Sequence, residues 1–367
     1  MGNNGSQIID QNGISYSLNE SDYTAIVAES PTTPNDIIIP RSIKPKSIEY
    51  TILGIKNNAF KSNKTIKTVN FADDSQIRFL EKSSFGDSTL EKISIPSQVT
   101  QIGEYCFFLC NNLKTVEFAG NSQLTQFGRF AFYFSTIESI TFPDLIETIQ
   151  MCFFFNCKNL KSVNFTENSR LKIIDRYAFS SSAIEKIKIP CHVTSINEFA
   201  FFGCLNLKEI EFDKNSELNL INKYSFVGTP LKKISIPSSV SKIESRSFSY
   251  CLDLRYVEFK YNSELVSIEK EAFFSNSIEN LSFPKSLKKV GVKAFASCQD
   301  LLSAEFIGDD LYIGQLCFGR CEKLFVMSFP NAIKISYASD SFKSVSADFA
   351  LFVCSSTQMI ERKFGIF

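Results

Sequence analysis

Cysteine has the most reactive side chain in this chain, since its thiolate binds metals and attacks electrophiles. Eleven cysteines occur, and five of them recur at an interval of 47 residues: Cys110, Cys157, Cys204, Cys251 and Cys298. A metal centre needs several ligands at short spacing, but the sequence has one histidine and no Cys-x-x-Cys pair. We therefore predict that these cysteines are buried as small apolar residues. We expect neither a metal nor a cofactor.

His192 is the only histidine, and it directly follows Cys191. Adjacent residues rarely present their side chains to each other as nucleophile and base, so a role in a turn is favoured over catalysis. The sequence lacks a Gly-x-Ser-x-Gly nucleophile elbow, a phosphate-binding loop and a His-Glu-x-x-His zinc motif. We expect that the protein is not an enzyme.

Phenylalanines set the frame in which these residues lie. In the series from Phe60 to Phe295, the gaps between successive phenylalanines of the repeat alternate between 25 and 22 residues. A period of about 20 to 50 residues is typical of stacked repeats. Burial of each ring stabilises the fold by about 1.5–3 kcal/mol. Nine of these phenylalanines are predicted to form the structural core: Phe107, Phe132, Phe154, Phe179, Phe201, Phe226, Phe248, Phe273 and Phe295.

Each repeat also contains a strand pattern. The segment from Leu113 to Phe118 reads apolar, two variable residues, then apolar, polar, apolar, which is the alternation of a strand. Identical strands at one-coil spacing are expected to stack into a parallel sheet, about 4.8 Å apart. Two coil types alternate, one ending its strand in proline (Ile95-Pro96) and one in a polar turn (Asn121-Ser122).

Stacking limits what the cysteines can do. Residues 47 apart lie two coils, about 10 Å, from each other, which is too far for a disulfide. Only Cys298 and Cys321, in adjacent coils, could come within range. Mostly free thiols favour a reducing compartment. The intervening coils are expected to hold other residues in this column: Phe134, Ser181, Gly228 and Ser275.

The strand Leu-x-x-Ile-x-Ile-Pro, then Val-x-x-Ile, then Ala-Phe-x-x-Cys resembles the BspA-like leucine-rich repeat family. Residues 193–204 are a close instance, and the likeness covers residues 34–345. The resemblance implies a β-rich (α/β-type) solenoid, a single curved right-handed superhelix with a parallel concave sheet and about 13 coils of 23–24 residues. It also implies a surface antigen or adhesin that contacts host or cell-surface proteins.

The two ends depart from the repeat and are predicted to act as caps. Residues 14–18 and 23–27 are expected to form a hairpin, with an extra strand near 48–52. A last strand is expected to begin at 350–353, followed by a helix-like tail at 357–364. The predicted divisions are a disordered start at 1–12, an N-terminal β cap at 13–33, the solenoid at 34–345, and a C-terminal cap strand and tail at 346–367.

Two surfaces are candidates for partner binding. On the sheet face, Tyr256 stands beside Arg255 among small and charged residues, and aromatic rings with polar neighbours often anchor interfaces. Phe108, Tyr133 and Phe155 each follow a core phenylalanine. Their rings are expected either to form an exposed patch that marks a partner site or to fill the outer wall of coils without a helix.

Composition excludes some partners. The chain carries 39 basic and 39 acidic side chains, which gives no electrostatic reason to expect nucleic acid. It shows neither a signal-peptide pattern nor an apolar run long enough for a transmembrane span. Gly2 with Ser6 matches the N-myristoylation pattern, although a polar start matching by chance is the alternative.

We therefore predict a monomeric, non-catalytic repeat scaffold that binds a protein partner. Its localisation is left open between the cell surface, which the family resemblance implies, and the cytoplasm. The cytoplasmic alternative, a scaffold or a cytoskeleton-associated structural protein, rests on the missing export signal and the free thiols.

Overall fold

The computed structural model describes residues 8–338, 340–346, 349–353 and 358–359. It is a β-solenoid of about 14 turns, which confirms the predicted fold class and is close to the predicted coil number. Within the described part of the chain, the elements are strands apart from one short 3-10 helix, η1 (Pro45–Ser47). The residues fall into two compact units, Met1–Leu171 with Ser181–Ile184 and Lys172–Ser180 with Glu185–Phe367.

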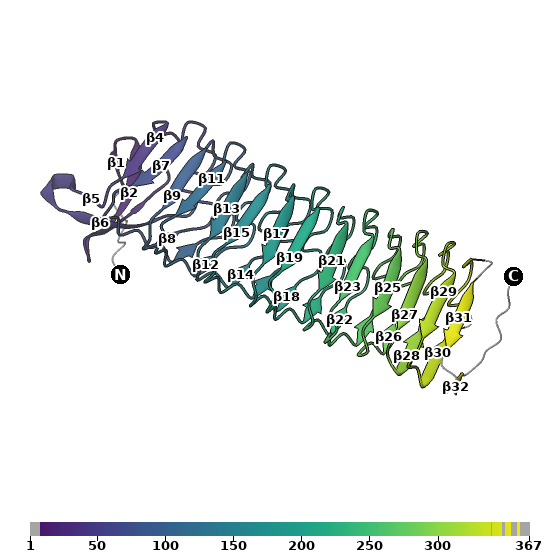
Figure 1. Cartoon of the computed structure of the whole chain (residues 1–367). Coiled ribbons are helices and arrows are strands. Elements are labelled where there is room, and N and C mark those ends of the chain that lie inside the picture. The colour runs from purple at the N-terminus through teal and green to yellow at the C-terminus, as the bar shows by residue number, and fades with distance from the viewer. Residues whose placement is uncertain (1–7, 339, 347–348, 354–357, 360–367) are drawn as a thin grey trace, which may run out of the picture. The chain divides into compact units, whose positions relative to one another are not determined.

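The first unit holds a sheet made of the long strand of each coil. Apolar side chains of these strands, such as Val69 and Ile93, point into the core, and polar ones such as Asn70 and Glu117 point out. The strands are parallel and lie side by side in Figure 1, one per coil. They are β4 (Asp36–Ile39), β7 (Thr68–Phe71), β9 (Lys92–Ile95), β11 (Thr115–Phe118), β13 (Ser139–Phe142) and β15 (Ser162–Phe165).

A second sheet of this unit begins with the N-terminal cap and continues into the short strand of each coil. Strand β5 (Ser42–Ile43) pairs with β6 off this path, and β14 (Thr148–Ile149) is a further short strand. The strands of the sheet are β1 (Ile8–Gln11), β2 (Ile14–Asn19), β3 (Thr24–Val27), β6 (Tyr50–Ile55), β8 (Phe79–Leu80), β10 (Gln101–Ile102) and β12 (Gln126–Phe127).

The cap differs from the expected one at its start. Strands β2 and β3 pair antiparallel as a hairpin, and β6 supplies the extra strand. Residues 8–11 form β1, which pairs antiparallel with β2, so the prediction of disorder throughout 1–12 is wrong for this segment. The apolar pair Ile8 and Ile9 gives β1 a strand character that the polar residues around it obscure.

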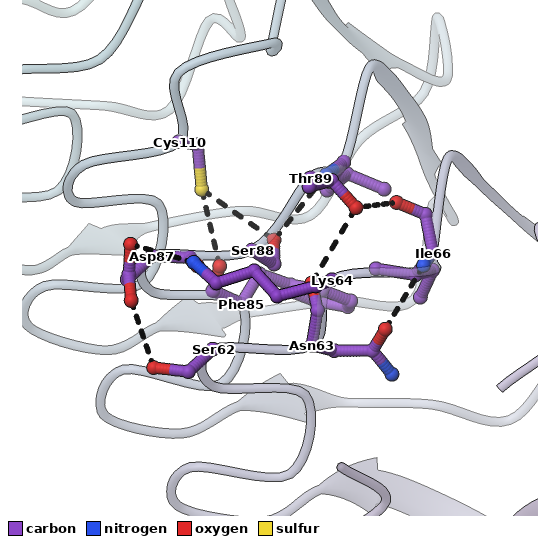
Figure 2. A network of polar contacts seen from close by, with 10 residues as sticks. Ser62, Asn63, Lys64, Ile66, Phe85, Asp87, Ser88, Thr89 and Cys110 are labelled. Atoms are coloured by element: carbon purple, nitrogen blue, oxygen red, sulfur yellow. Dashed lines mark hydrogen bonds and ion pairs between the residues drawn. The ribbon is translucent and has the colours of Figure 1, made fainter. Parts of the chain in front are cut away.

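A polar network connects the first coils to each other (Figure 2), and one of its residues, Asn63, also bonds to the cap. The side chain of Asn63 is fully buried, its Nδ2 donates to the carbonyl of Ser30 at 2.9 Å, and its Oδ1 accepts from the backbone N–H of Ile66 at 2.9 Å. Lys64 Nζ reaches the next coil and donates to Asp87 Oδ1 at 3.0 Å. Each buried polar group of Asn63 is thus satisfied, and the cap is fixed to the coil beneath it.

The second unit repeats the arrangement with its own strands. Its long strands are β17 (Lys186–Ile189), β19 (Glu209–Phe212), β21 (Lys233–Ile236), β23 (Tyr256–Phe259), β25 (Asn280–Phe283), β27 (Ser303–Phe306), β29 (Val326–Phe329) and β31 (Ala350–Val353). Its short strands are β16 (Ile173–Ile174), β18 (Ser195–Ile196), β20 (Leu220–Ile221), β22 (Lys242–Ile243), β24 (Ser267–Ile268), β26 (Lys289–Val290), β28 (Asp310–Ile313), β30 (Lys334–Tyr337) and β32 (Gln358–Met359).

At the C-terminal end, the strand at 350–353 pairs with β29 in parallel. Residues 358–359 form β32, which pairs with β30, so the helix-like tail expected at 357–364 is wrong at these two positions. The remainder of that tail lies outside the described residues.

Core phenylalanines stack in a column inside each unit. In the first unit, the rings from Phe60 to Phe154 are fully buried, with centroids 5.1 to 5.7 Å apart and planes within 16° of parallel. In the second unit, the rings from Phe179 to Phe342 lie 4.9 to 6.1 Å apart and within 7° of parallel. All nine phenylalanines of the predicted core are fully buried.

The outer wall of each coil is neither helix nor strand. It crosses through two residues with left-handed backbone, four positions apart, such as Tyr105 (φ 57°) and Leu109 (φ 52°). The backbone N–H groups of Tyr105, Phe107 and Leu109 donate to carbonyls of the following coil at 2.8 to 3.0 Å. These bonds hold a backbone conformation that costs about 1–3 kcal/mol for each residue other than glycine.

Candidate functional site

Tyr256 begins strand β23 and its side chain projects outward from the sheet, 58% exposed. Its partners in register on the two neighbouring strands are Lys233 and Asn280. The following turn of the same coil carries Tyr261, which is 96% exposed. This coil therefore presents two exposed aromatic rings within a polar surface.

Arg255 precedes Tyr256 and forms an ion pair, with Nη1 3.1 Å from Glu279 Oε1 in the next coil. Both side chains keep contact with solvent, and such pairs contribute about 0.2–1 kcal/mol. In the first unit, Lys92 and Glu117 of neighbouring strands also form an ion pair, at 2.8 Å. The charges of the sheet faces thus pair between neighbouring coils.

Phe108, Tyr133 and Phe155 are half-buried in the first unit. The ring of Tyr133 stacks on Phe155 with centroids 5.3 Å apart. Phe108 covers Gly86 of the preceding coil, where a Cβ atom would lie 2.2 Å from the ring. This packing favours the outer-wall interpretation of the three rings over that of an open patch.

Further aromatic side chains surround these three. Phe130 contacts Tyr133 and stacks on Tyr105 at 4.6 Å, and Phe134 lies against Tyr133 at 4.6 Å with 36% of its surface exposed. The ammonium group of Lys82 sits 5.7 Å from the ring centroid of Tyr105, within the range of a cation–π contact. The outer aromatic cluster therefore comprises Tyr105, Phe108, Phe130, Tyr133, Phe134 and Phe155.

Two recesses lie where the long strands of the first unit end. The first recess, about 490 Å³, lies between the polar turn at 72–76 and residues 117–119, with residues 94–98 between them. The second recess, about 530 Å³, lies between the polar turn at 118–123 and Thr166, with residues 139–145 between them. Residues 117–119 line both, so the two recesses share a wall.

Three of the recess carboxylates have partners within the protein: Asp74, Glu117 and Asp144. Glu117 forms the ion pair with Lys92 and accepts from Ser94 Oγ at 3.1 Å, and the hydrogen bond from Lys92 holds the pKa of Glu117 below its usual value. In the second recess, the hydroxyl of Thr166 donates to Asp144. Glu117 is therefore held in its ionised form by partners within the protein itself.

The sequence analysis missed a second regular set of phenylalanines. In five coils that do not end their strand in proline, the last strand residue is a half-buried ring, whereas the ring that continues their spacing, Phe306, and the same position in the proline-type coils are buried. The 47-residue spacing of these rings was the available signal. They are Phe71, Phe118 and Phe165 in the first unit and Phe212 and Phe259 in the second.

The cysteine column is structural. Each of the five thiols is fully buried and donates to the carbonyl of the core phenylalanine in the preceding coil, at 3.0 to 3.2 Å. Burial raises the pKa of Cys110 to about 12 and that of Cys251 to about 11. A nucleophilic thiolate is therefore not available at neutral pH. Cys298 and Cys321 are both free and buried.

The residues expected between these cysteines are wrong by one position. Cys157 contacts Ser135 rather than Phe134, and Cys251 contacts Thr229 rather than Gly228. Phe134 and Gly228 are residues with left-handed backbone. The turn that they make directs the following side chain into the core, which shifts the column by one residue.

His192 does not face Cys191 as a base would. Its Nδ1 lies 3.0 Å from Glu217 Oε1 in the polar turn of the next coil, and both side chains are exposed. No group of three or more metal-ligating side chains comes together among the described residues. In the same part of the chain, no helix has the length and apolar character needed to cross a membrane. Gly2 lies outside the described residues.

Comparison with known proteins gives three findings. The model of the BspA type leucine rich repeat region matches residues 40–161, 125–255 and 248–364. The structure is similar to a leucine-rich repeat protein from Bacteroides ovatus, with 22% identity, a TM-score of 0.67, and coverage of 94% of this chain and 99% of that one. The pneumococcal vaccine antigen PcpA is also similar, with 19% identity, a TM-score of 0.52 and coverage of 95% and 98%. No curated protein matches the chain.

Proposed function

Because the chain belongs to the BspA-type leucine-rich repeat family, we propose that it is a non-catalytic scaffold that binds a protein partner at a cell surface. Repeat solenoids offer extended surfaces on which a partner contacts many coils at once. The partner is a protein of a host or of another cell, and the chain acts as a surface antigen or adhesin. The vaccine antigen among the proteins of similar fold supports this role.

The observation that carries the proposal is the exposed ring of Tyr256 on the sheet face. Interfaces concentrate their binding energy in a few aromatic and arginine side chains surrounded by polar residues. Tyr256 has Lys233 and Asn280 as its neighbours in register, and Arg255 lies beside it. Tyr256 is therefore the anchor of the proposed interface, and Arg255 is its charged neighbour.

Surface labelling tests the proposal. Intact cells that express the full-length protein are treated with a membrane-impermeant biotin reagent, and a second sample is permeabilised first. We expect the two samples to label the protein equally, with a cytosolic protein of the same cells as the control for leakage. Labelling that occurs only after permeabilisation would contradict a role at the surface.

A second candidate function is a cytoplasmic scaffold or cytoskeleton-associated structural protein. It is favoured by the buried cysteines that carry free thiols, among them Cys110, Cys251 and Cys298, since a reducing compartment keeps thiols in this form. Protease treatment of intact cells separates the two candidates. A cytoplasmic scaffold stays full-length under conditions that remove a surface protein.

A further inference from the structure

The two recesses of the first unit arise from the alternation of coil types. Six residues after strand β9 the chain enters its next short strand, whereas it takes eight residues to do so after β11. The polar turns of the longer coils therefore project past the proline turns between them. One recess forms at the proline turn after β9 and the other at the proline turn after β13, so the two lie two coils apart, which corresponds to about 10 Å.

Equivalent side chains are held in the same way in both recesses. Gln76 Nε2 donates to the carbonyl of Asp74 at 3.1 Å, and Gln123 Nε2 donates to the carbonyl of Asn121 at 3.1 Å. These glutamines are 47 residues apart. The backbone N–H of Gln123 also donates to Ser97 in the proline turn beneath, at 2.9 Å. The recesses are thus two copies of one preformed site.

The lining combines aromatic rings with uncharged polar groups. Phe71 and Phe118 line the first recess, and Phe118 and Phe142 line the second. Hydroxyl and amide side chains surround the rings, among them Ser97 and Thr141. The face of an aromatic ring can contact the apolar C–H groups of a ligand, and the short polar side chains around it can form hydrogen bonds with hydroxyls at the ligand's edge. This combination suits a ligand that carries hydroxyl groups around an apolar face.

The charge of the lining side chains further restricts the chemical class of the ligand. Neither recess is lined by a lysine or arginine, and both include carboxylates. The recess carboxylates Asp74 and Glu117 form ion pairs with Arg41 and Lys92, so these two cations are already engaged. An anionic polymer would meet these carboxylates without compensating cations, which disfavours nucleic acids and acidic glycans.

We propose that the two recesses are subsites for a neutral linear glycan, a ligand class separate from the protein partner of the sheet face. A polymer of pyranose rings repeats its own structure, as the recesses do. The distance between the recesses corresponds to about two ring repeats, so a ring and the second ring after it occupy neighbouring recesses and a disaccharide reaches only one of them. Each shallow recess binds weakly, and a chain that reaches both gains affinity because the second contact becomes intramolecular.

Calorimetric titration of the full-length protein tests this inference. The probes are cellohexaose, laminarihexaose, mannohexaose and chitohexaose, each compared with its disaccharide. At least one hexasaccharide is expected to bind about 10²-fold more tightly than its disaccharide, the lower end of the gain for two linked contacts. The variant Thr141→Lys fills the second recess from an exposed strand position, and Asn111→Lys adds the same side chain at an exposed position outside both recesses.

We expect Thr141→Lys to lower the hexasaccharide affinity to that of the disaccharide, while Asn111→Lys binds like the wild type. Circular dichroism melts of both variants verify that they remain folded. Failure of every hexasaccharide to bind, or equal binding by the two variants, would overturn the proposal. Neither result bears on the protein interface at Tyr256.

Discussion

Replacement of one core ring tests the stacked column inside the second unit. Phe201 is fully buried, with Phe179 and Phe226 stacked on its two faces at centroid distances of 4.9 and 5.1 Å. The substitution Phe201→Ala removes both ring contacts, each worth about 0.5–1.5 kcal/mol beyond burial. It also leaves a cavity that the parallel rings above and below cannot fill. Phenylalanine-to-alanine changes in cores cost about 3–5 kcal/mol, and we expect a value near the middle of this range.

The adjacent residue supplies a matched control. Phe202 is 37% exposed and its ring contacts that of Phe199 at a centroid distance of 5.7 Å, so Phe202→Ala is expected to cost about 1 kcal/mol. Urea unfolding followed by far-ultraviolet circular dichroism gives the difference in unfolding free energy. Hydrogen exchange locates the loss of stability along the chain. Because each repeat interacts with its nearest neighbours, the loss of protection in Phe201→Ala should centre on residues 179–226. Equal costs for the two variants would refute the stacked-ring explanation of stability.

Three further predictions follow from the fold. The buried thiols have raised pKa values, about 12 for Cys157 and about 11 for Cys251, so they stay protonated in the folded state while the unfolded chain loses these protons above about pH 9. Stability should therefore decline between about pH 9 and 12 in urea titrations, and a pH-independent midpoint across this window would contradict it. The variant Gly86→Ala should destabilise the fold because its Cβ meets the Phe108 ring, and Phe108→Ala in the same chain should remove most of that penalty, as a double-mutant cycle would measure. Lys92→Met should raise the pKa of Glu117 towards its usual value in an NMR titration while costing less than about 1 kcal/mol; an unchanged Glu117 pKa would argue against the ion pair.

Periodicity explains why so much of the fold could be predicted. Every coil repeats the same positions, so a wrong assignment of one position would recur in all coils and conflict with the other patterns. The spacing of the core phenylalanines and the alternation in segments such as Leu113 to Phe118 therefore constrain each other. The strands, their parallel order and the two coil types follow from these two patterns. The buried cysteine column follows as well, since its interval equals two coils.

The outer wall could not be predicted in the same way. Tyr105 and Phe130 adopt left-handed backbone conformations that bulky residues rarely occupy, and hydrogen bonds and ring stacking between coils hold them there. No local propensity signals such a conformation. The same turns moved the cysteine column by one residue, from Phe134 to Ser135. The same turns also orient Phe108, Tyr133 and Phe155, whose rings pack against the outer wall of the coils.

The recesses were missed for a different reason. They depend on the difference in turn length between neighbouring coils, which has meaning only once the coils are stacked in register. Phe118 belongs to the regular set of half-buried rings, and in the sequence the spacing of this set is as regular as that of the core rings. Burial, and not residue type, separates the two sets.

Adhesion of protein-coated beads tests the sheet face as a binding surface most directly. Beads carrying the wild-type chain are applied to cultured epithelial cells and to immobilised extracellular-matrix proteins, beside beads carrying Tyr256→Ala. Tyr312→Ala is the matched control, because Tyr312 is an exposed tyrosine of the same unit on short strand β28. Loss of an interface anchor costs about 2 kcal/mol, so Tyr256→Ala should weaken binding about 30-fold while Tyr312→Ala binds like the wild type. Equal adhesion by all three, or none by the wild type, would contradict the proposed role.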